Sequence, residues 1–125
     1  MGAFSFPKGE RLRTRDFKKL SRDGKKLNSN YFLILYSHNG LGKSRLGVTV
    51  SKRVGRAVAR NRVKRLVREH FRHHKAELKD GYDVNVIAKS GSSELSSREI
   101  TKALDAVFRD MLRKCDDEAF SAGTH

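Results

Sequence analysis

The sequence predicts a single-domain α+β sandwich in which helices cover one small sheet. Three observations support this fold class: helical periodicity in three segments, continuous or alternating apolar residues in others, and glycine-containing turns between them. A chain of 125 residues can bury one core but is too short for a two-domain enzyme. The order of elements is α-β-β-α-β-α, and one additional short strand would make it α-β-β-β-α-β-α.

A first, one-sided helix is predicted over residues 15–23. Thr14 is a suitable N-cap because its hydroxyl can accept a hydrogen bond from the first turn. Phe17 and Leu20 fall on the inner side of this helix, and Gly24 suits a left-handed helix end.

Three strands are predicted in the first half of the chain and one in the second half. A short strand can form at residues 25–28, and the continuous apolar run of residues 31–36 predicts a strand that is buried on both faces. Residues 45–51 alternate between apolar and polar side chains, and the turn residues 38–43 before them predict an antiparallel hairpin. A further strand is predicted at residues 82–88.

Two longer amphipathic helices complete the domain. Residues 56–73 carry apolar side chains at helical spacing. The last helix starts at Ser96, where Glu99 completes a capping box, and its apolar stripe indicates core packing. Residues 116–125 are polar and without periodicity, so we expect a single domain over residues 1–115 followed by a disordered tail.

Basic residues dominate the chain and are concentrated at its centre. The sequence has 28 Lys and Arg against 14 Asp and Glu, a formal net charge of +14. Residues 52–75 hold 10 Lys or Arg and 1 acid, whereas residues 76–125 hold 7 and 10. The positive side chains of so basic a segment repel one another unless an anion binds there. The segment has more Arg than Lys, and this favours phosphate as the anion, because guanidinium groups bind phosphate through two hydrogen bonds. We therefore expect a nucleic-acid partner.

On a helical wheel the central helix has a cationic face beside its apolar face. Arg62 falls on a third side, near Glu69 and His73. Arg56 and Arg60 lie in the first turns, where the helix dipole disfavours cations and free backbone N–H groups can bind phosphate. A bound polyanion explains this arrangement better than helix stability does.

Other chemistries have less support. Cys115, the single cysteine, excludes an internal disulfide and fits a reducing compartment, and no apolar run is long enough for a signal peptide or a membrane span. We therefore expect a cytoplasmic protein with no membrane partner and no small-molecule substrate. His70, His73 and His74 have a spacing that could bind zinc, but no carboxylate or thiol ligand is evident near them in the sequence, so we predict no metal site.

The sequence also argues against a protein catalytic centre. A protein nuclease needs clustered carboxylates for Mg²⁺, and Glu69 is the only acid between Asp23 and Glu77. The residues alone therefore indicate an RNA- or DNA-binding module without catalytic residues.

The run from Arg60 to Arg72, Arg-Asn-Arg-Val-Lys-Arg-Leu-Val-Arg-Glu-His-Phe-Arg, closely resembles the signature helix of the bacterial ribonuclease P protein family. Further matches are Arg11-Leu12, Asp16-Phe17, the run from Arg45 to Arg53, and Tyr82-Asp83-Val84, so that the resemblance covers roughly residues 8–114. It implies a mixed sheet of about four strands and a left-handed parallel crossover around the central helix. Spacing could not predict this crossover, because such connections are nearly always right-handed.

The resemblance also implies a function. A member of this family would assist a catalytic RNA in removing the 5′ leader of precursor tRNA, with Mg²⁺ bound mainly by the RNA. The residues implied to contact the catalytic RNA are Arg60, Asn61, Arg62, Lys64, Arg65, Arg68 and Arg72. The residues implied to line a cleft for the leader are Phe17, Ser51, Lys52, Arg53, Arg56 and Lys89, with Tyr36 as a further candidate.

One position departs from the family pattern. Members often carry a second aromatic residue one helical turn after Phe17, and this chain has Ser21 there, which leaves Tyr36 as the candidate replacement. A general RNA-binding or ribosomal protein without a processing role is the alternative function. Both would bind RNA with a steep salt dependence, so stimulation of precursor tRNA cleavage is what separates them.

Overall fold

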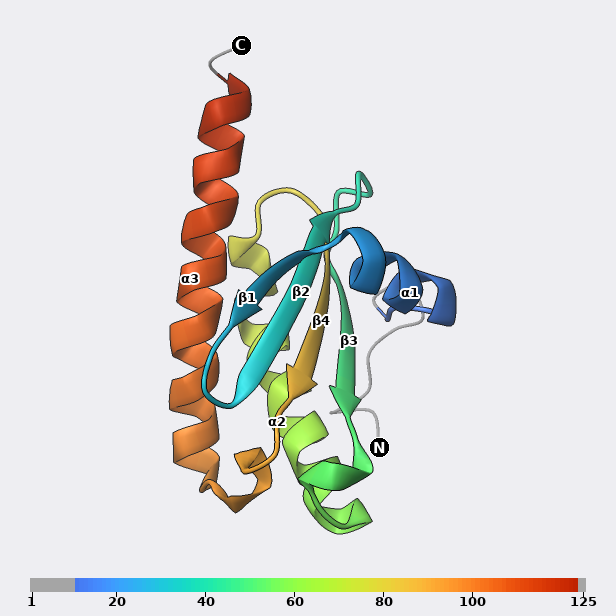
Figure 1. Cartoon of the computed structure of the whole chain (residues 1–125). Coiled ribbons are helices and arrows are strands. Elements are labelled where there is room, and N and C mark those ends of the chain that lie inside the picture. The colour runs from blue at the N-terminus through green and yellow to red at the C-terminus, as the bar shows by residue number, and fades with distance from the viewer. Residues whose placement is uncertain (1–10, 124–125) are drawn as a thin grey trace.

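The computed structural model describes the backbone of residues 11–123 and the side chains as far as Asp116. The described chain has the predicted α+β order, including the additional short strand (Figure 1). The elements are α1 (Thr14–Asp23), β1 (Lys25–Asn28), β2 (Phe32–His38), β3 (Arg45–Val50), α2 (Ala57–His74), β4 (Tyr82–Ala88) and α3 (Ser97–Gly123). Short 3-10 turns precede α2 (η3, Lys52–Val54), follow it (η4, Lys75–Glu77) and precede α3 (η5, Ser92–Glu94).

The four strands form one mixed sheet in the order β1-β2-β4-β3. β2 is antiparallel to both β1 and β4, and β3 is parallel to β4. The predicted antiparallel hairpin between β2 and β3 is therefore wrong, because β4 lies between them. β4 suits this central place, since it presents Val84 and Val86 to one face of the sheet and Ile87 to the other.

The connection from β3 through α2 to β4 is a left-handed crossover. Figure 1 shows β3 and β4 pointing in the same direction, with α2 behind the sheet and β4 to the left of β3. Parallel neighbours cannot be joined by a tight turn, so a long connection such as α2 is required. The handedness is the rarer one and agrees with what the family resemblance implied.

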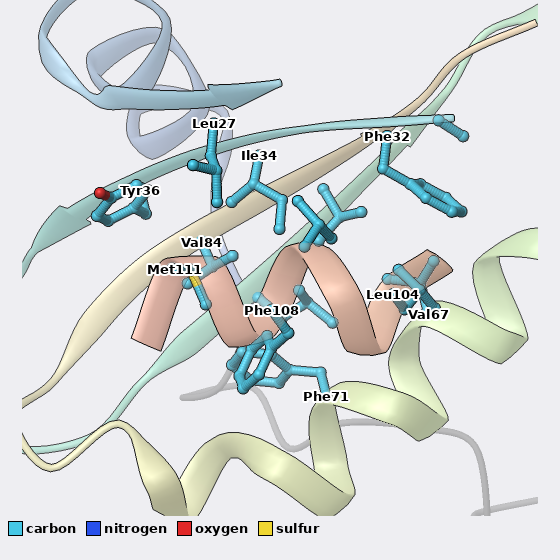
Figure 2. Packing of buried hydrophobic residues seen from close by; sticks show 14 of the residues in the cluster. Leu27, Phe32, Ile34, Tyr36, Val67, Phe71, Val84, Leu104, Phe108 and Met111 are labelled. Carbon is cyan, nitrogen blue, oxygen red and sulfur yellow. The ribbon is translucent and has the colours of Figure 1, made fainter. Parts of the chain in front are cut away.

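The two faces of the sheet differ in what covers them. α2 and α3 cover the face that carries Phe32, Ile34 and Val84, and Figure 2 shows these side chains packed against residues of both helices. α1 covers part of the other face, where a smaller cluster forms around Leu20 and Leu35. The main core therefore lies on one side of the sheet, and the described residues cover the other side only in part.

The helix ends differ in detail from the prediction. The N-cap of α1 is Arg13, whose backbone N–H donates to Asp16 at 2.9 Å, and Gly24 is extended (φ −71°) rather than left-handed. The Ser96–Glu99 capping box is confirmed by two reciprocal hydrogen bonds of 2.9 and 3.1 Å. The backbone of α3 stays helical as far as Gly123, whereas the sequence led us to expect a tail without regular structure from residue 116.

A largely buried ion network fixes α1 to the sheet. Arg45 on β3 donates from Nε and Nη2 to the two carboxylate oxygens of Asp83 on β4, at 2.8 and 2.7 Å. The same Nη2 lies 3.2 Å from Asp16 on α1, and the three side chains are only 13–18% exposed. The hydrogen bonds to Asp83 raise the pKa of Arg45, so the guanidinium remains charged. One cation thus joins two strands and a helix.

We predict that Arg45→Met lowers the free energy of unfolding by about 2–4 kcal/mol, because it leaves two poorly hydrated carboxylates without a counterion. Urea denaturation at neutral pH measures this loss. The double variant Arg45→Met/Asp83→Leu should recover part of it, since one of the two stranded charges is removed as well. A double variant that is as unstable as the sum of the two single variants would contradict this account.

Candidate nucleic-acid interface

The central helix α2 is attached to the core along one side and is basic along the neighbouring side. Val63, Val67 and Phe71 are buried against the sheet and α3. Of the predicted RNA-binding residues, Asn61, Arg65 and Arg72 are exposed, and Arg60, Arg62, Lys64 and Arg68 are half-buried. Because the apolar stripe prevents the helix from turning, its cations keep a fixed direction.

Contacts with α3 show which flank of α2 carries the cationic face. Arg62 and His70 both reach toward residues of α3 or the loop before it. At 100° per residue, Lys64 and Arg68 then lie on the opposite flank, away from α3. We call the flank that carries Lys64 and Arg68 the cationic flank. It is not covered by α3, the helix with which α2 packs.

Arg60 stands out within this flank. Its Nε atom is buried and has no hydrogen-bond partner. An unpaired buried donor costs free energy, and sites of this kind often await a ligand. The side chain is placed in the first turns of α2, where the N-cap residue, Arg56, provides no side-chain cap for the backbone N–H groups. An anion at this end would meet both kinds of donor.

Arg62 is held by partners in the loop before α3 and at the start of that helix. Its Nη2 donates to the carbonyl oxygen of Leu95 at 2.8 Å and to Ser97 Oγ at 3.3 Å. The same loop is attached to η3 by Ser93, whose hydroxyl donates to the carbonyl of Val54 at 2.6 Å. Arg62 therefore supports the loop before α3, and a contact with RNA through its remaining donors stays a prediction.

Phe17 lies on the partly covered face of the sheet. A Cβ atom at Gly47 would come within 2.3 Å of the Phe17 ring, so only glycine lets α1 bring the ring so close to β3. The ring is half-buried and packs against the small cluster of this face. Next along β3 on the same face is Thr49, whose hydroxyl donates to the side-chain oxygen of Asn85 at 3.1 Å. A ring beside polar side chains makes a surface on which an unpaired base can stack.

The other predicted leader-binding residues gather at one end of this face. Val50 pairs with Ala88 in the parallel register of β3 and β4, so Ser51 and Lys89 follow at the same end of the sheet. Ser51, Lys52, Arg53 and Arg56 are exposed. Lys89 is half-buried, and its ammonium donates to the carbonyl of Ser29 at 2.5 Å and to the side-chain oxygen of Asn28. Lys89 therefore also fastens the turn between β1 and β2.

The prediction that Tyr36 lines this cleft is wrong. Its side chain is 2% exposed and belongs to the main core, on the face opposite to Phe17. Side chains alternate along a strand, so Tyr36 shares its face with Phe32 and Ile34. Its ring lies 6.4 Å from that of Tyr82, and burial raises the pKa of the Tyr36 hydroxyl. No base can reach this ring.

One group of potential metal ligands lies elsewhere in the described chain. His70 and His74 on α2 approach Asp105 on α3, and the ligand atoms of the three side chains lie within 4.8 Å of one another. The prediction that no carboxylate lies near these histidines is therefore wrong, because Asp105 faces them across the contact of α2 with α3.

Among the residues that the structure describes, no helix is long and apolar enough to cross a membrane.

Comparison with known proteins agrees with this geometry. The family model described as Ribonuclease P matches residues 6–112. The chain is 43% identical over 114 residues to the ribonuclease P protein component of Desulforapulum autotrophicum, covering 90% of this chain and 97% of that protein. It is 45% identical over 91 residues to the component from Thermotoga maritima, covering 72% of this chain and 78% of that protein.

The chain also superposes on solved structures of RNase P proteins. The RNase P protein of Staphylococcus aureus superposes with a TM-score of 0.77 at 30% identity, over 82% of this chain and 94% of that one. The RNase P protein of Thermotoga maritima superposes with a TM-score of 0.70 at 38% identity, over 80% and 96%. Because the family model matches most of the chain, and relatives and solved structures of 30% identity or more agree with it, this chain belongs to the bacterial ribonuclease P protein family.

Proposed function

We propose that this protein binds the catalytic RNA of ribonuclease P through the cationic flank of α2 and the single-stranded 5′ leader of precursor tRNA through the sheet face that carries Phe17. Membership in the family makes the chain a subunit of ribonuclease P, the endoribonuclease that forms the 5′ ends of tRNA. The observation that carries the proposal is the cationic flank itself, which is anchored by the core and turned away from α3.

The two surfaces meet where β3 leads into α2. Residues 51–56 follow β3 at the end of the sheet face of Phe17 and lead into the helix whose flank is cationic. A leader lying along this face would therefore come close to the RNA bound by α2. This continuity supports a protein that holds the substrate and the catalytic RNA together, in the cytoplasm where precursor tRNA is made.

We place Mg²⁺ and the cleavage chemistry on the RNA. Asp16, next to Phe17 in the sequence, and Asp83 on β4 are both engaged by Arg45. They are thus poorly suited to hold a hydrated Mg²⁺, which needs carboxylates facing an open site. The protein's contribution is then binding and charge neutralisation rather than acid–base chemistry.

The direct test is cleavage of precursor tRNA by a matching catalytic RNA at low Mg²⁺, with and without the protein. We expect the protein to restore cleavage of a precursor with a leader of several nucleotides, because its cations replace part of the Mg²⁺ needed to bring two RNAs together. RNA binding without any stimulation would instead favour the alternative, a general RNA-binding protein.

A matched pair of lysines tests the α2 surface. Lys64→Ala should weaken binding of the catalytic RNA by about tenfold and reduce the slope of log affinity against log salt by about one, as expected for a lost phosphate contact. Lys102→Ala removes the same charge from an exposed position on α3 and should change neither quantity. Filter binding at several salt concentrations measures both, and equal effects of the two substitutions would mean that only net charge matters.

Phe17→Leu tests the leader surface while keeping an apolar side chain next to Gly47. Loss of a stacked base costs about 1–3 kcal/mol, so the preference of the holoenzyme for precursor over mature tRNA should fall by about tenfold. Tyr36→Phe should leave this preference unchanged because the ring is buried. A Phe17→Leu variant that loses affinity equally for both tRNA forms would contradict the assignment.

A further inference from the structure

Two histidines and an aspartate form a cluster between α2 and α3, outside both RNA-binding surfaces. His70 Nε2 lies 2.7 Å from Asp105 Oδ1, and His74 Nε2 lies 3.9 Å from the same oxygen. The two imidazole rings are stacked, with centroids 4.1 Å apart and planes inclined by 14°. Both Nε2 atoms therefore lie near one carboxylate oxygen, and only that of His70 is hydrogen-bonded to it.

The hydrogen bond on the other side of His74 determines what this nitrogen can do. His74 Nδ1 lies 2.8 Å from the carbonyl oxygen of His70, and a carbonyl can only accept, so Nδ1 carries the proton. In the neutral ring Nε2 then carries the lone pair, 3.9 Å from Asp105 Oδ1. Because the two rings are nearly parallel, an ion shared by both Nε2 atoms requires the His74 ring to rotate out of the stack until the two lone pairs converge. A backbone carbonyl bound to Nδ1 is also the usual arrangement that orients Nε2 toward a metal.

The cluster is open to ions from solution. It lines a cavity of about 330 Å³ together with Glu77, Phe108, Arg109 and Leu112. His74 and Asp105 are partly exposed, with 35% and 42% of their side-chain surface accessible, whereas His70 is 6% exposed. Glu77 on η4 borders the same cavity and offers a second carboxylate, which offsets the charge of Arg109.

We propose that His70, His74 and Asp105 form a binding site for Zn²⁺ or a similar transition-metal ion, with water or Glu77 as the fourth ligand. Imidazole nitrogens with one carboxylate suit such ions, whereas Mg²⁺ prefers oxygen ligands alone. Ligands about 2.0–2.1 Å from a tetrahedral ion are roughly 3.3 Å apart, and the present separations of 2.7 and 3.9 Å lie on either side of that value. Binding requires the neutral His70 ring to change tautomer: Nε2 releases its proton to solvent, Nδ1 takes up a proton from solvent, and the Nε2 lone pair then binds the ion.

A metal ion here would join α2 to α3 from the side that faces away from the cationic flank. His70 also contacts the Phe108 ring edge-on at 5.6 Å, so the ligand set is backed by the main core. The site is therefore a cross-link between the RNA-binding helix and the helix that supports it, and it is separate from the Mg²⁺ that we place on the RNA.

The experiment uses the full-length protein without RNA. We expect Zn²⁺ to bind with one equivalent in calorimetric titration and to raise the midpoint of thermal unfolding by several degrees, because it binds the folded chain alone. Co²⁺ should give the visible absorption of a four-coordinate ion. Millimolar Mg²⁺ should not displace Zn²⁺, and displacement would overturn the choice of metal.

Variants of the two more exposed ligands separate a site from scattered surface binding. His74→Gln and Asp105→Asn should each weaken Zn²⁺ binding by more than about tenfold and abolish the rise in the unfolding midpoint. His73→Gln, on the same helix but outside the cluster, and Cys115→Ser should both retain them. Circular dichroism verifies that each variant is folded. The proposal fails if the wild type shows no binding, or if the ligand variants and the controls bind alike.

Discussion

The parallel pairing of β3 with β4 is the constraint on which the rest of the structure depends. Parallel neighbours require the chain to return from one end of the sheet to the other, and α2 makes that return. The helix must therefore lie on the sheet, which gives it its buried stripe of Val63, Val67 and Phe71. Its first turn necessarily follows the end of β3. The same topology thus places the basic helix and the end of the leader surface next to each other.

The opposite face of the sheet is built by a different means. Among the described residues, α1 and the preceding Leu12 cover it, and Gly47, which has no side chain, lets Phe17 lie against β3. The ion pairs of Arg45 then hold α1 in the position relative to β3 that this contact needs. A larger helix on this face would have buried the strand ends and the ring. Within the part of the chain that the structure describes, the small size of α1 leaves part of this face open, which the proposed binding of the leader requires.

Local patterns predicted the elements well and their partners poorly. The helical spacing of Val63, Val67 and Phe71 identified α2, and the burial of these residues agrees with it. Strand pairing was mispredicted because a turn after β2 indicates a hairpin, whereas the insertion of β4 depends on contacts distant in sequence. The period of two along β2 already placed Tyr36 with Phe32 and Ile34, so its burial could have been predicted.

Neither the ion network nor the complete histidine cluster can be predicted from residues that are close together in the sequence. Arg45 finds its partners on α1 and β4, and His70 finds Asp105 on α3, so each set exists only after the sheet and helices have assembled. A search for ligands by sequence spacing detects the two histidines one turn apart but not the carboxylate that faces them. Only the packing of α2 against α3 brings the third ligand into place.

Charge is distributed unequally between the segment that contains α2 and the rest of the chain after it. Residues 52–75 carry a large basic excess, whereas residues 76–125, which include α3, carry more acids than bases. α3 lies against the flank of α2 that carries Arg62 and His70, and the uncovered cations are on the other flank. Residues 97–112 of α3 carry three basic and three acidic side chains, so the supporting helix is close to neutral and the excess positive charge of this pair of helices lies on α2. A basic flank beside a neutral supporting helix gives the field a direction, which orients an approaching polyanion as well as attracting it.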